Sequence, residues 1–257
     1  MSYQSPVAPA PDPARLRLLA EGADKIYKLF IVRIVFDLLS LVLLLVTAVT
    51  AIGVSTSITG AAMPLGQNWT QVSTVYTGAG NISGVLAAYG LLMLLGLVAA
   101  VITLYFLYTG MRALSGYDAE RYDIGFLGAK LWVGGILGTA VGLVVLVASA
   151  AARSIGGVVA GFLVLAFSGI AVLAATVLVL IALWRLGGEP GGDSIRLGIG
   201  LLIAAIVAGL LAAALPALLV LAVALQLAGE LALMLGAKRV RDAALERMAA
   251  ASFNVTA

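Results

Sequence analysis

The sequence predicts an all-α integral membrane protein, a bundle of six membrane-spanning helices. No charged residue occurs between Asp37 and Arg112, and most of that interval is Leu, Val, Ala, Ile and Gly. The chain as a whole is 63% hydrophobic and 11% charged, whereas soluble domains hold about 25% charged residues. About twenty apolar residues cross the hydrocarbon core of a bilayer. Because runs of that length recur to the end of the chain, one compact helical bundle in lipid is expected.

The ends of the chain differ from its middle. Residues 1–13 are rich in Pro, Ala and Ser and predict a flexible tail. Residues 14–28 are basic and partly amphipathic, which indicates a juxtamembrane helix on the membrane surface rather than a cleavable signal. The transmembrane domain is expected over residues 29–236. Residues 237–257 predict a basic cytoplasmic helix and tail.

The spans are placed by the limits of the apolar runs. The first covers residues 29–53, and an uncharged outer loop rich in Ser, Thr and Gly follows it. A loop of charged residues, Arg112, Asp118, Glu120, Arg121 and Asp123, separates the second and third spans. A loop of Gly and Pro turn signals at residues 185–196 precedes the last apolar block. The remaining spans are expected at residues 84–108, 124–148, 155–184 and within 197–235.

The last apolar block, residues 197–235, admits one span or two. A single straight helix would be roughly 50 to 60 Å long, more than a bilayer core requires. Two spans joined near residues 211–216 place every one of the 15 Lys and Arg residues except Arg153 on one side. The positive-inside rule then puts both termini in the cytoplasm, with the protein in the plasma membrane.

Two glycosylation sequons, at Asn68 and Asn81, fall in the predicted outer loop. A third, at Asn254, falls on the predicted cytoplasmic side and should stay unmodified. Chance occurrence in Ser- and Thr-rich sequence is the alternative explanation.

A weak internal repeat accompanies the charge pattern. The segments that enter the membrane from the basic side begin alike, at Arg17, Arg112 and Arg185. This similarity suggests three parallel helical hairpins, although it is the less favoured of two explanations. The alternative is that loops between glycine-rich spans converge on Arg, Gly and Asp.

Glycines spaced four apart predict close helix packing. Such spacing leaves one helix face without side chains, so another helix can approach closely. Packing within the bundle is the favoured interpretation, and a homo-oligomer interface is the alternative. The helix-packing residues are Gly134, Gly138, Gly142, Gly157 and Gly161.

Four polar residues within the spans form a predicted intramembrane cluster. Arg33 and Asp37 lie four apart on the first span, and Gln226 and Glu230 lie four apart on the last. Both pairs have similar predicted depths on the basic side. Buried charge in a membrane is costly and is usually paired, so we expect the four to meet. A staple that closes the bundle is favoured over a proton or cation relay.

The composition excludes several chemistries. The chain holds no His and no Cys, which removes the usual ligands of zinc and iron–sulfur centres and the common nucleophile pairs. No cofactor, metal or nucleic-acid partner is expected. Tyr122-Asp123 and Gly191-Gly192-Asp193 superficially match motifs of intramembrane aspartyl proteases, but both aspartates fall in polar loops. An enzyme is therefore not expected.

Most of the chain resembles a known family. The segments at residues 16–30, 116–138 and 184–206, with Gly116-Tyr117 and Trp184-Arg185-Leu186-Gly187, are similar to the archaeal polytopic membrane family catalogued as domain of unknown function 973. The resemblance implies an archaeal cell membrane and carries over no catalytic residue.

The function predicted from these observations is non-enzymatic. We expect a structural or accessory subunit that associates with other membrane proteins or with copies of itself in the lipid bilayer. A small transporter or channel that uses the Arg33, Asp37 and Glu230 cluster is the alternative.

Overall fold

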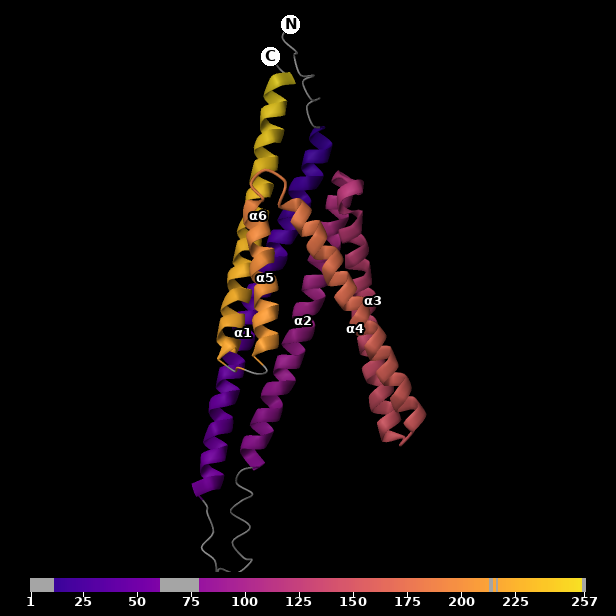
Figure 1. The fold of residues 1–257 in the computed structure, drawn as a ribbon, viewed down its shortest axis with the longest axis vertical. Helices are drawn as coiled ribbons and strands as arrows, with labels where there is room; N and C mark the ends of the chain where they lie inside the picture. Colours follow the sequence, from indigo (N-terminus) through magenta and orange to yellow (C-terminus); the bar gives the residue numbers. More distant parts are fainter. Residues whose placement is uncertain (1–11, 61–78, 213–214, 216, 256–257) are drawn as a thin grey trace, which may run out of the picture. The chain divides into compact units, whose positions relative to one another are not determined.

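The computed structural model describes the backbone of residues 12–60, 79–212, 215 and 217–255, and the side chains of residues 12–43, 94–149, 151–212, 215 and 217–251. These residues form helices and no strand, which confirms the all-α fold (Figure 1). The predicted tail, residues 1–13, lies almost wholly outside this part. The helices are α1 (Pro13–Gly60), α2 (Ala79–Tyr117), α3 (Ala119–Ala151), α4 (Ile155–Leu186), α5 (Asp193–Leu211) and α6 (Leu218–Val255).

Five helices, α2 to α6, contain stretches long and apolar enough to cross a membrane. The remaining predicted span lies in α1, whose side chains after residue 43 fall outside the described residues. The chain divides into two compact units. Unit 1 contains Met1–Ile31 and Thr103–Ala257, and unit 2 contains Val32–Ile102, where α1 ends and α2 begins.

Two antiparallel hairpins dominate unit 1. In the α3–α4 hairpin, Gly142 on α3 faces Leu165, and farther along α3 Leu146 faces Gly161. The α5–α6 hairpin likewise pairs Gly198 with the backbone of Gly229. The last apolar block is therefore two helices rather than one continuous rod, because α5 ends at Leu211 and α6 begins at Leu218.

Turn residues set the limits of the helices. A carboxylate oxygen of Asp118 accepts a hydrogen bond from the backbone N–H of Arg121 at 3.2 Å, which caps the start of α3. The predicted charged loop between the second and third spans is therefore wrong, since Asp118 alone separates α2 from α3. Between α3 and α4, Arg153 adopts a left-handed φ of 53°, and the Ser154 hydroxyl caps the backbone N–H of Gly157.

Two predicted domain boundaries fall inside unbroken helices. Helix α1 runs from the juxtamembrane stretch, residues 14–28, into the predicted first span without interruption. Helix α6 likewise continues from its apolar half through residue 237 to Val255. Intrahelical backbone bonds continue across the change from apolar to charged residues, because the change in solvent does not itself end a helix.

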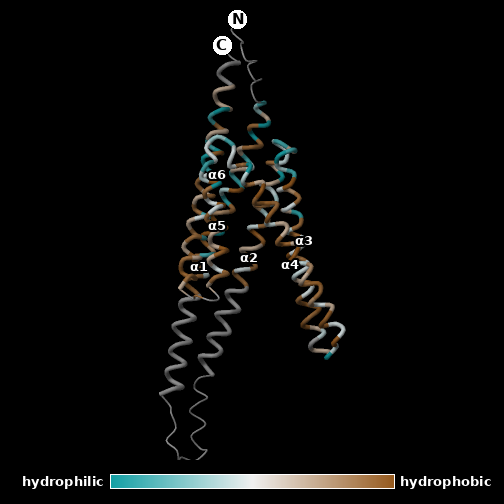
Figure 2. The backbone as a smooth tube through the Cα atoms, viewed as in Figure 1, coloured by the Kyte–Doolittle hydropathy of each residue, from teal (hydrophilic) through white to brown (hydrophobic). Residues whose placement is uncertain are grey.

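The buried core of unit 1 lies where the charged residues gather. Figure 2 shows hydrophilic residues gathered along part of α6 and at the start of α3, and mostly apolar residues along the helices beyond them. Away from this end, large apolar side chains are exposed, among them Phe167 on α4, which is 70% exposed. In a lipid-facing helix such exposure is expected. The core takes side chains from six helices, including Leu19, Ile26, Met111, Leu114, Tyr122, Leu186, Ile195, Leu233 and Val240.

Candidate functional site

Unit 1 contains only two of the four residues of the predicted intramembrane cluster, Gln226 and Glu230. On α6 the Gln226 amide donates a hydrogen bond to a carboxylate oxygen of Glu230 at 3.5 Å, as their spacing of four residues predicts. The Glu230 side chain is fully buried. A buried carboxylate in an apolar helix is costly unless it is satisfied, so this pair is the most pronounced polar feature of the α6 span.

The other half of the predicted cluster belongs to the second unit. Arg33 and Asp37 lie on α1 within Val32–Ile102, and both are partly exposed. The encounter of all four side chains therefore stays a prediction. The chain has no cysteine of its own, so cross-linking of Asp37→Cys with Glu230→Cys would test it without background.

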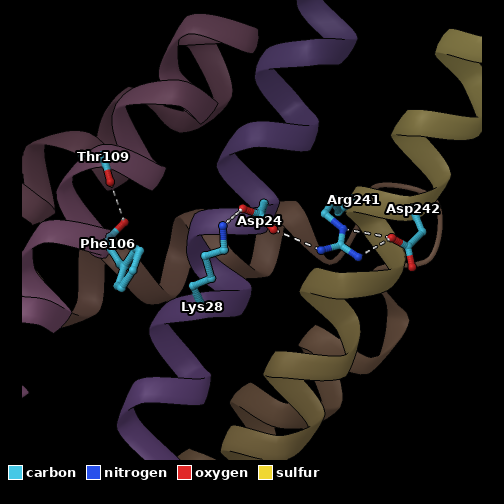
Figure 3. A network of polar contacts seen from close by, with 6 residues as sticks. All are labelled: Asp24, Lys28, Phe106, Thr109, Arg241 and Asp242. Atoms are coloured by element: carbon cyan, nitrogen blue, oxygen red, sulfur yellow. Dashed lines mark hydrogen bonds and ion pairs between the residues drawn. The ribbon is translucent and has the colours of Figure 1, made fainter.

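A charged network joins α1 to α6 within unit 1, and Figure 3 shows Asp24 lying between two cations. The Asp24 carboxylate accepts from Lys28 at 2.7 Å and from Arg241 at 3.1 Å. Arg241 also pairs with Asp242 at 2.8 Å, and its guanidinium lies 5.5 Å from the centre of the Tyr27 ring. Burial alone would raise the pKa of Asp24, but the hydrogen bonds from Lys28 and Arg241 outweigh it, so the pKa is lowered.

A second network fixes the turn between α4 and α5. The side chain of Glu189 is 7% exposed, and its carboxylate lies 3.3 Å from Arg121 Nη1. The Tyr122 hydroxyl donates to the same carboxylate at 3.5 Å. Arg185, at the end of α4, donates to the backbone carbonyls of Glu120 and Arg121. The turn is thereby attached to the start of α3 by charge-assisted hydrogen bonds.

Four of the five predicted packing glycines face the partner helix of their own hairpin. A Cβ on Gly138 would meet the hydroxyl of Ser168. Gly142, Gly157 and Gly161 face Leu165, Ser149 and Leu146.

Gly134 is different, because no heavy atom outside its own helix turn lies within 4 Å of the position of a Cβ. Gly135 takes its place in the hairpin contact and faces Val172. The face toward α4 therefore follows Gly135, Gly138 and Gly142, a spacing of three and four residues that suits helices packed nearly parallel to one another's axes.

Other predicted positions are placed as follows. Asn68 lies outside the described residues, and Asn81 lies in the first turn of α2, where side chains are not described. The aspartates of the protease-like motifs, Asp123 and Asp193, are both exposed. The Ser115 hydroxyl donates a hydrogen bond to Asp123. Among the described residues, no group of three or more acidic side chains is arranged to hold a metal ion.

The sequence reasoning missed the two networks that hold the charged end together. Asp24 and Arg241 are 217 positions apart, so no local spacing links them. Glu189 could have been noticed, because it is the one acidic residue in a turn of glycines, RLGGEPGG, that lies between basic residues. The local sequence nevertheless does not reveal its contact with Arg121 and Tyr122.

Comparisons of the chain with protein-family models, with curated proteins and with solved structures gave no match.

Proposed function

We propose that this chain is a structural or accessory subunit of a membrane assembly, formed with other membrane proteins or with further copies of itself. The observation that carries the proposal is the poor burial of the α3–α4 hairpin. In the most apolar stretches of α3 and α4, 11% of the residues are buried within the chain, whereas 28% are buried in that of α5. In lipid, helices associate through close van der Waals contact and small residues rather than through the hydrophobic effect.

Exposed glycines on both helices of the hairpin suit such contact. Gly134 on α3 and Gly169 on α4 have open space where a Cβ would stand. Leu137 and Leu173 beside them are 62% and 70% exposed. At either glycine, another transmembrane helix can therefore approach the backbone closely and pack against the neighbouring apolar side chain.

Isolation in mild detergent with native mass measurement tests the proposal. We expect a mass above that of one chain, from further copies or from co-purifying membrane proteins. Gly134→Cys should form cross-links to a neighbouring chain, whereas Val220→Cys, on the exposed surface of α6, should not. A monomer without partners, together with no cross-link at either position, would refute the proposal.

The resemblance to the archaeal family and the charge distribution support the proposed location, a cell membrane with both ends of the chain inside. Within unit 1, the N-terminal part of α1 and the C-terminal half of α6 lie together where the charged residues gather, because Asp24 contacts Arg241. Positive charge favours the cytoplasmic side. A thiol reagent that cannot cross membranes should label Ala251→Cys only after the cells are opened. Modification of Asn68, removed by Asn68→Gln, would support the opposite face being outside.

Transport is the second candidate, and the fully buried Glu230 beside Gln226 favours it. A titratable group inside a span marks proton or ion pathways in many transporters. Purified protein in vesicles should then dissipate a proton or sodium gradient, and Glu230→Gln should abolish the flux. Equal leak through wild type and Glu230→Gln would leave the assembly role as the only candidate.

A further inference from the structure

The side chain of Arg196 lies against the turn that precedes its helix. A Cβ on Gly187 would lie 2.7 Å from Cγ of Arg196, and one on Gly188 would lie 3.1 Å from its Nη2. The arginine stem therefore crosses the turn where two residues lack side chains. Its guanidinium carbon lies 5.6 Å from the centre of the Trp184 ring, within the range of a cation–π contact. We call these four residues the Arg196 cradle.

The cradle lies on an exposed and partly apolar part of the surface of unit 1. Trp184 is 50% exposed, and Leu197, next to Arg196 on α5, is 62% exposed. Both helices that carry the cradle, α4 and α5, are apolar enough to cross a membrane. Tryptophan with one polar edge favours the level of the lipid headgroups, so the cradle marks that level on the surface of unit 1.

A second cation on α3 is arranged in the same way. Lys130 is exposed, and its Nζ lies 4.2 Å from the centre of the Phe126 ring, one turn back toward the charged end. Its neighbours Leu127 and Leu131 are 52% and 37% exposed. A lysine within an apolar span reaches toward the interface with its ammonium group while its stem stays in the apolar layer.

Neither cation has a carboxylate partner among the described residues. Within the described part of the chain, no carboxylate lies within ion-pair distance of Arg196 or Lys130, although other cations at the same end, such as Arg121 and Arg241, have such partners. A lipid-exposed positive charge without a counter-charge attracts an anion at the headgroup level. The guanidinium of Arg196 can bind two phosphate oxygens at once.

We propose that Arg196 and Lys130 bind the phosphate of anionic phospholipids at the charged end of unit 1. A lipid with a zwitterionic headgroup brings its own cation, which competes for the phosphate, so the sites should prefer a net negative headgroup. The aromatic rings of Trp184 and Phe126 hold the cations in place and contact the glycerol and upper acyl region. This preference does not depend on whether the chain assembles with partners.

The test uses the full chain purified in detergent and supplied with phosphatidylglycerol or phosphatidylcholine, with retained lipid counted by native mass spectrometry. Wild type should retain phosphatidylglycerol preferentially. Each of Arg196→Gln and Lys130→Gln should weaken that preference about fivefold, the effect of one basic residue near an anionic surface. The matched control is Arg153→Gln, which removes an exposed cation from the α3–α4 turn and should leave the preference unchanged.

Three results would overturn the proposal. One is equal retention of both lipids by wild type. Another is an unchanged preference in the double variant Arg196→Gln/Lys130→Gln when its melting temperature without added lipid equals that of wild type. The third is full competition by soluble glycerol phosphate, which would show that the sites take a free phosphate and not a lipid. A double variant that melts lower than wild type is replaced by Arg196→Lys, which keeps the charge, loses the planar contact with Trp184 and should bind phosphatidylglycerol more weakly.

Discussion

Removal of the Asp24 charge tests whether α1 and α6 are joined by their ion pairs. Asn at this position keeps the shape of the side chain but is neutral, so it forms no ion pair with Lys28 or Arg241. Charge-assisted hydrogen bonds contribute about 1.5–3 kcal/mol each when shielded. The Arg241 and Asp24 side chains retain 26% and 24% exposure, so solvent weakens the pair, and we expect Asp24→Asn to lower the free energy of unfolding by about 1–2 kcal/mol.

The same carboxylate should make stability depend on pH. Its folded pKa lies below the ordinary value of 3.8, so the charged form is favoured in the folded state. The stabilisation is complete above the ordinary pKa and is lost as the pH falls through the folded pKa. Wild type should therefore lose this stabilisation as the pH falls below the ordinary pKa of 3.8, and Asp24→Asn should lose less stability over the same fall in pH.

Unfolding in mixed micelles, followed by tryptophan fluorescence at pH 7 and at pH 3, measures both effects. Glu246→Gln is the matched control, because Glu246 is an exposed carboxylate on the same stretch of α6 as Arg241. If Asp24→Asn and Glu246→Gln were equally stable and equally sensitive to acid, the ion pairs would not hold α1 to α6.

Two further predictions concern the hairpins. Gly198→Ala should destabilise the α5–α6 pair by about 1–3 kcal/mol, because its Cβ would lie 2.7 Å from the backbone oxygen of Gly229. The control is Gly200→Ala, whose Cβ would meet nothing within 4 Å and which should be neutral or slightly stabilising. Equal melting temperatures for the two variants would contradict the close crossing of α5 and α6. Trp132→Phe should cost about 1 kcal/mol, because the indole N–H donates to the Thr176 hydroxyl at 3.1 Å across α3 and α4. The loss should be absent when Thr176→Val is already present, as a double-mutant cycle in detergent would show.

The helices were largely predictable because their signal is local. Apolar runs give the spans, and the break between α5 and α6 followed from length and charge balance alone. Polar composition suggests irregular structure, so the sequence predicts a loop in the charged segment around Asp118. In fact a single capping residue is enough to end one helix and start the next.

The glycine faces show where a periodic pattern becomes ambiguous. Gly134 and Gly135 are adjacent, and spacing alone favoured the former because it continues a series of four. An α-helix turns about 100° per residue, so neighbours point to different sides. Only the position of α4 decides that Gly135 faces the hairpin and Gly134 faces outward.

The sequence by itself determined the solvent of this protein, its helical class and the collection of basic residues at one end, since each depends on hydrophobicity and charge counted along the chain. The tertiary structure alone decided which charges meet. Asp24 with Arg241 and Glu189 with Arg121 come from distant segments, and Arg196 and Lys130 are left without carboxylate partners in the described chain. The physical reason is that pairing energies act over a few ångströms in space, whatever the separation in sequence.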